Sequence, residues 1–134
     1  MKLRREQTAG DWRVRGYRDD EIELVRLSPD GAPEHRTIQG ATLVSATQLE
    51  GAWTAPPFEQ LTVADLAPII ALEPEVVLLV SGPVSRPPHP ALSAALAARG
   101  IGCEAMETGA ACRTFNALAA EGRRVVLALP GQSA

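Results

Sequence analysis

Two short polar turns hold the residues that are best placed for chemistry. Ser81-Gly82 follows the apolar run 76–80, and Thr108-Gly109 follows the run 101–106. If both runs are parallel strands, their carboxyl ends meet at one edge of a sheet, where α/β proteins bind ligands. A helix that starts near Gly109 adds backbone N–H groups that attract anions, and arginines add paired donors. The predicted ligand-binding residues are Ser81, Gly82, Arg86, Glu107, Thr108, Gly109, Cys112 and Arg113.

The same residues also have a structural interpretation. Thr108 is a suitable cap for the helix that follows it, and the arginines are able to pair with Glu107 or Glu104. Most helix starts bind water rather than a ligand. We therefore favour structural roles for these side chains over an anion site.

Cys112 is the one candidate nucleophile. A place in the first turn of a helix and a neighbour such as Arg113 both lower a thiol pKa, and His89 is a conceivable base. However, no third group is evident that would orient the base, and a cysteine among alanines is commonly packed in a core. Cys103 is expected to pack on a strand. We predict no catalytic residues, and the chain is not expected to be an enzyme.

Several classes of function are disfavoured by missing motifs. No GxxxxGK[ST] follows Val80 and no GxGxxG occurs, which argues against nucleotide hydrolysis and hydride transfer. Two histidines and two cysteines match no zinc spacing, so neither a metal nor a cofactor is predicted. The net charge of -3 disfavours nucleic acid as a partner, because such domains neutralise phosphates with basic side chains.

The expected compartment is the cytoplasm. The two cysteines form no CxxC, as is usual in a reducing environment. No apolar run follows the basic residues near Met1, and no apolar stretch is long enough to cross a bilayer. We predict no direct insertion into a membrane.

The first half of the chain has the pattern of an antiparallel sheet. Apolar and polar residues alternate over 12–17 and 22–27, and the turn Ser28-Pro-Asp-Gly31 leads into 35–38. A further strand is predicted at 42–46. In the loop that follows, Trp53 and Phe58 are expected to pack against the edge of the core.

The second half reads as alternating helices and strands. Thr62 is a predicted N-cap, with Pro68 in the first turns of its helix. The run 76–80 lacks alternation, as in a strand that is covered on both faces. Helix 90–99, strand 101–106, helix 109–121 and strand 124–129 complete a βαβαβ unit. With 134 residues the chain is one α/β domain, with expected tails at 1–11 and 130–134.

Four segments of this half resemble a known family: Leu72-Glu-Pro-Glu-Val-Val-Leu-Leu79, Arg99-Gly-Ile-Gly102, 105–118 with its Ala-Cys-Arg-Thr-Phe-Asn, and Glu121-Gly-Arg-Arg-Val125. The family is the uncharacterised bacterial and archaeal one that includes the mitochondrial assembly factor of respiratory complex I, the Mth938-like domains. Clear similarity covers 61–129, and weaker similarity reaches back from Trp53 to Trp12.

The resemblance implies a three-layer fold around a mixed sheet. It brings no catalytic residue, metal or cofactor, and in mitochondrial members it implies a scaffolding role. Three segments depart from the family pattern. Val80-Ser81-Gly82 replaces Gly-Thr-Gly, 106–108 has Glu107 in place of Asp, and 86–88 replaces a pattern with Phe-Pro.

The sequence thus predicts a non-enzymatic assembly or interaction factor that binds protein partners. The alternative is a small anion- or metabolite-binding domain, or an unrecognised enzyme, with its site at the carboxyl edge of the parallel strands. A third possibility is homodimerisation through an edge strand of the N-terminal sheet.

Overall fold

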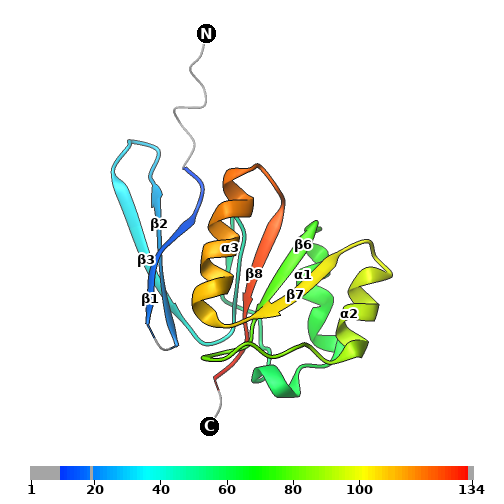
Figure 1. The fold of residues 1–134 in the computed structure, drawn as a ribbon. Helices are drawn as coiled ribbons and strands as arrows, with labels where there is room; N and C mark the ends of the chain where they lie inside the picture. Colours follow the sequence, from blue (N-terminus) through cyan, green and yellow to red (C-terminus); the bar gives the residue numbers. More distant parts are fainter. Residues whose placement is uncertain (1–9, 19, 133–134) are drawn as a thin grey trace.

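A computed structural model describes residues 10–18 and 20–132. Its N-terminal part is a three-stranded antiparallel sheet of β1 (Arg13–Arg18), β2 (Glu21–Leu27) and β3 (Pro33–Gln39), in that order (Figure 1). Gly31, with φ 91°, makes the turn between β2 and β3. Alternation in β2 and β3 directs Ile22, Leu24 and Ile38 into the core, as the pattern predicts.

The second sheet has five strands in the order β5-β4-β8-β6-β7. Three of its strands are parallel: β6 (Val76–Val80) runs parallel to both of its neighbours, β7 (Gly102–Met106) and β8 (Val125–Leu129). On the other side of β8, β4 (Thr42–Val44) pairs antiparallel and β5 (Leu49–Glu50) completes the sheet. The sheet is therefore mixed, as the family resemblance implies. Sequence reasoning grouped 42–46 with the N-terminal strands, whereas β4 lies in this sheet.

Within the described residues, two short 3-10 helices and three α-helices connect these strands. They are η2 (Phe58–Gln60), η3 (Val63–Leu66), α1 (Ala67–Ala71), α2 (Pro90–Ala97) and α3 (Thr108–Ala120). Thr62 is the N-cap residue of η3, as predicted. The Thr62 N–H donates to the Asp65 carboxylate at 2.7 Å. Pro68 lies in the first turn of α1, where no donor is missed.

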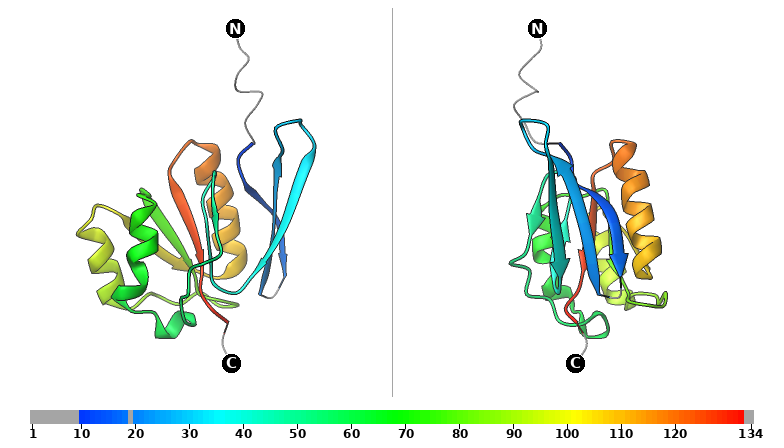
Figure 2. Two further views of the ribbon diagram at one scale, coloured as in Figure 1. Left: turned by 180° about the vertical axis from the view of Figure 1, so that it is seen from behind. Right: turned by 90° about the vertical axis from the view of Figure 1, so that its left-hand side faces the viewer.

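The helices cover the two faces of the five-stranded sheet and give three layers (Figure 2). Along β6, Val77 and Leu79 pack with α1 and α2, while Leu78 and Val80 pack with α3 and the three-stranded sheet. This two-sided burial explains why 76–80 shows no alternation of polar and apolar residues. Trp53 is buried as expected, and its indole N–H donates to the Asp65 carbonyl at 2.9 Å.

Helix α3 joins the three-stranded sheet to the rest of the domain. Asn116 accepts from the Val14 N–H and donates to the Val14 carbonyl, both at 2.9 Å, so its amide acts as a strand partner for β1. No described helix is long and apolar enough to cross a membrane.

Some segments expected as tails are bound to the fold. The Gly131 N–H donates to the Pro56 carbonyl at 3.1 Å, and the Gln132 amide donates to the Asp20 carboxylate at 2.6 Å. At the other end, the Gly10 N–H donates to the Leu27 carbonyl at 2.7 Å. Gly10, Gly131 and Gln132 are therefore hydrogen-bonded to the fold, while 1–9 and 133–134 lie outside the described residues.

Candidate functional site

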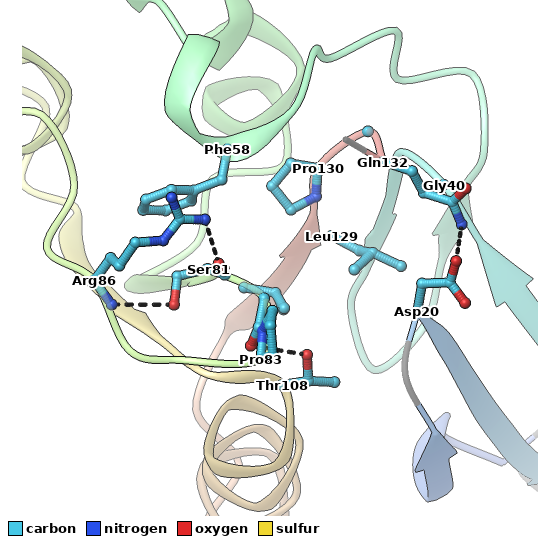
Figure 3. A pocket seen from close by; sticks show the side chains of 13 residues that line it. Asp20, Gly40, Phe58, Ser81, Pro83, Arg86, Thr108, Leu129, Pro130 and Gln132 are labelled. Carbon is cyan, nitrogen blue, oxygen red and sulfur yellow. Dashed lines mark hydrogen bonds between the residues drawn. The ribbon is translucent and has the colours of Figure 1, made fainter. Parts of the chain in front are cut away.

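A pocket of about 390 Å³ lies where β6 and β8 end (Figure 3). It is bounded by the loop after β6, the segment after β8, the aromatic ring of η2 and the turns that flank β2 and β3. Its lining residues are Asp20, Gly40, Phe58, Val80, Ser81, Gly82, Pro83, Arg86, Thr108, Leu129, Pro130, Gly131 and Gln132.

Half of the residues predicted for a site line this pocket. Ser81, Gly82, Arg86 and Thr108 meet at its wall, at the sheet edge that the strand order predicts. Glu107, Gly109, Cys112 and Arg113 do not line it. That this edge binds a ligand stays a prediction.

The loop after β6 is braced by its own side chains and by the start of α3. The Ser81 hydroxyl donates to the Val84 carbonyl at 2.7 Å and accepts from the Arg86 N–H at 3.2 Å. Gly82, with φ 104°, turns its carbonyl to the Thr108 N–H at 2.9 Å and the Thr108 hydroxyl at 3.2 Å. Both hydroxyl protons therefore bond to backbone carbonyls, so neither side chain is set up as a nucleophile beside a base.

Arg86 supplies the positive charge of the pocket. Its guanidinium donates to the Ser81 carbonyl at 2.7 Å and to the Glu59 carboxylate at 3.0 Å. It also lies 4.9 Å from the centre of the Phe58 ring, a cation–π contact. Phe58, expected only as packing, thus packs partly on the core and also holds Arg86 at the pocket wall.

The start of α3 is occupied by Glu107 rather than open to an anion. The Glu107 carboxylate accepts from the N–H groups of Gly109 at 2.6 Å and Ala110 at 3.1 Å. The Thr108 N–H bonds to Gly82 and the Ala111 N–H bonds to the Glu107 carbonyl. All four first donors of the helix are satisfied. The predicted cap, Thr108, is therefore wrong: Glu107 is the N-cap residue.

Tyr17 of β1 covers the outer side of this helix start. A methyl group at Gly109 would overlap the Tyr17 hydroxyl, and the Arg113 guanidinium donates to that hydroxyl at 3.1 Å. Arg113 also pairs with Glu107 at 3.7 Å, as the structural interpretation expects. These contacts lie apart from the pocket.

Cys112 does not have the environment of a nucleophile. Its side chain is only 2% exposed, on the side of α3 that faces the core. This burial raises the pKa of the thiol to about 12, and the negative charge of Glu107 makes a smaller contribution in the same direction. His89 caps α2, where its ring accepts from the Ala91 N–H at 3.0 Å. Because α2 and α3 cover opposite faces of the sheet, the imagined Cys/His pair does not form.

The other nine residues that line the pocket were not among the predicted site residues. Asp20 precedes β2 and Gly40 follows β3, while Leu129 ends β8 and Pro130 and Gln132 follow it. One signal for the second group was available, since β8 is parallel to β6 and its carboxyl end must lie at the same edge. This signal was not used, because 130–134 were interpreted as a tail. No comparable local signal pointed to Asp20.

Metal binding gains no support among the described residues, where no group of three or more His, Cys, Asp or Glu side chains is placed to hold an ion. The carboxylates near the pocket are used differently. Asp20 accepts from an amide and Glu59 pairs with a guanidinium. The pocket chemistry is that of hydrogen bonding and charge, with an apolar wall.

Solved structures of similar proteins share this fold. An NMR structure of a Xanthomonas campestris protein has a TM-score of 0.73 and 32% identity, covering 92% of this chain and 88% of that chain. A crystal structure from Bordetella parapertussis has a TM-score of 0.74 and 32% identity, over 91% and 97% of the two chains. A Bordetella pertussis protein described as a Mth938-like domain has a TM-score of 0.67 and 26% identity, over 98% and 92%.

No functionally curated protein matches the chain. A family model described as "Protein of unknown function (DUF498/DUF598)" matches residues 14–130, almost the whole described fold. The match includes every segment on which the resemblance was based. The chain therefore belongs to the DUF498/DUF598 family, and its resemblance to Mth938-like domains is confirmed.

Proposed function

We propose that the protein is a non-enzymatic interaction or assembly factor that binds a protein partner through the pocket and the loop beside it. The reactive side chains at this edge support binding over catalysis. The hydroxyl protons of Ser81 and Thr108 are held by carbonyls, and Cys112 is buried with a raised pKa.

The observation that carries this proposal is Val84. It is 60% exposed and lies on the braced loop, next to Pro83 of the pocket lining. The pocket itself offers the apolar surfaces of Phe58, Leu129 and Pro130. An apolar side chain held outward beside a preformed pocket resembles the central part of protein interfaces, where a few anchors supply most of the affinity.

The test is partner capture with matched variants. Tagged protein and the variants Val84→Asp and Leu27→Asp are used to recover partners from an extract of the source organism, with quantitative mass spectrometry. Leu27 is also exposed, at 55%, and it is the last residue of β2. The pocket lies at the other end of this seven-residue strand, about 20 Å away. We expect a partner with the parent protein and the Leu27 variant, and its loss with Val84→Asp.

Two results would overturn this proposal. The first is that no protein is enriched over the tag alone. The second is that a partner binds equally to all three proteins, which would place the interface elsewhere. Thermal midpoints of the variants must match the parent, because both substitutions are at exposed positions.

The second candidate function is binding of a small anion or metabolite in the same pocket. Arg86 favours this function. Each of its two terminal guanidinium nitrogens carries two hydrogens and uses one of them in the hydrogen bonds described above, so each has a second hydrogen to donate to a ligand. Titration with carboxylates and phosphate, followed by amide chemical shifts of Gly82 and Gly131, tests this function. Unchanged shifts at millimolar ligand would exclude it.

A further inference from the structure

We propose that the pocket recognises a small amino carboxylate whose two charges lie at opposite ends of an apolar body. This inference rests on the second proposed function and names its ligand class. It starts from the arrangement in Figure 3, where Arg86 and Asp20 stand on opposite sides of the cavity with Pro130 and Leu129 between them.

The Arg86 side is suited to a carboxylate. The Phe58 ring and the Ser81 carbonyl fix the plane of the guanidinium, so little side-chain freedom remains to be lost on binding. A guanidinium donates two parallel hydrogen bonds to a carboxylate. The Arg86–Glu59 pair is a weak competitor, because its side chains are 40% and 47% exposed and such ion pairs contribute little.

The Asp20 side is suited to an ammonium group. One oxygen of the Asp20 carboxylate accepts from the Gln132 amide at 2.6 Å, which orients the group. The other oxygen keeps its capacity to accept from a cation. Since Gln132 is neutral, it leaves the negative charge of Asp20 uncompensated in this contact.

The middle of the pocket is apolar and of limited size. Val80, Pro83 and Leu129 contribute hydrocarbon to the wall. A sphere of about 390 Å³ is about 9 Å across. A linear chain with an ammonium group at one end and a carboxylate at the other fits this order of charges, whereas a phosphate offers nothing to Asp20 or to the apolar wall.

The experiment uses three chain-matched probes in calorimetric titrations: 6-aminohexanoate, hexanoate and hexylamine. We expect 6-aminohexanoate to bind at least about tenfold more tightly than either singly charged analogue. In Asp20→Asn, its affinity should fall to that of hexanoate, and in Arg86→Gln to that of hexylamine. Glu23→Gln, which neutralises an exposed carboxylate outside the pocket lining, should change nothing.

The inference is overturned if the three probes bind equally, if none binds at millimolar concentration, or if Asp20→Asn leaves the preference for 6-aminohexanoate intact. Asp20 is the decisive position, because its side chain is exposed and Asn keeps an acceptor for Gln132. Failure here is distinguishable from failure of the proposed function. Hexanoate binding alone would keep an anion site, and partner capture is measured independently of any small ligand.

Discussion

At the residue scale, the polar side chains that point to chemistry in the sequence mostly hold the edge of the sheet together. Ser81 and Thr108 bond to loop carbonyls, and Glu107 closes the start of α3. Sequence reasoning identified the residue types, the edge and the Arg113–Glu107 pair. It did not identify the loop carbonyls that Ser81 and Thr108 bind, because hydrogen bonds between distant segments leave no local pattern. Arg86 is the exception, since it keeps donors for a ligand.

Cys112 is predicted to be unreactive in the folded protein. With a pKa of about 12, about one thiol in 10⁵ is ionised at pH 7, and the sulfur is buried as well. Iodoacetamide at neutral pH should leave Cys112 unmodified in the native protein and modify it after unfolding, as read by peptide mass spectrometry. Rapid native modification would restore the nucleophile hypothesis.

Glu107 is predicted to stabilise the protein as the cap of α3. Its replacement by Ala leaves the Gly109 and Ala110 N–H groups without their acceptor and should lower the free energy of unfolding by about 1 kcal/mol. Glu107→Gln keeps one acceptor oxygen and should cost less. Urea unfolding measures both, and an unchanged midpoint for Glu107→Ala would contradict the assignment.

At the element scale, local patterns were sufficient for most of the fold. Most predicted helices and strands begin and end within two residues of those in the structure, because caps, turns and periodicity act over a few residues. The helix predicted after Thr62 differs, since it is divided into η3 and α1. The pairing of β4 with β8 was missed, since it joins segments far apart in the chain. Burial of β6 on both faces, in contrast, was predicted correctly from its run of apolar residues.

Asn116 is predicted to be the main polar link between α3 and the three-stranded sheet. Asn116→Ala leaves the Val14 N–H and carbonyl without partners and should cost about 1–3 kcal/mol of stability. Asn116→Asp keeps the acceptor and loses the donor, so it should lie between. Thermal or urea unfolding of both variants measures this. If Asn116→Ala is as stable as the parent, the two Asn116 bonds contribute nothing to the docking of α3 on β1.

At the scale of the whole molecule, the pocket is assembled from segments that no single motif connects. Its walls come from the turns before β2 and after β3, from η2, from the loop after β6 and from the residues after β8. The strand-edge rule predicted the part that follows β6 and applies equally to β8. The positions of Asp20 and Phe58 in the pocket depend on how the two sheets and the connecting loop pack together. A single sequence does not reveal that packing.

The segment after β8 is predicted to be part of the fold. An added Cβ at Gly131 would lie 2.6 Å from the Ala55 carbonyl oxygen, which is backbone and does not move easily. Gly131→Ala should therefore destabilise the protein by about 1–3 kcal/mol. A matched Gly51→Ala, where a Cβ meets nothing within 4 Å, serves as the control. Equal midpoints for the two variants would mean that the segment is not docked.

The most direct measurement of the central claim, that the pocket and its loop are the binding surface, is an amide shift map of the labelled protein with its captured partner. We predict the largest shifts at Gly82, Val84, Thr108 and Gly131, and none at Gly31 in the turn between β2 and β3. Shifts confined to that turn or to the outer edge of β3 would contradict the account.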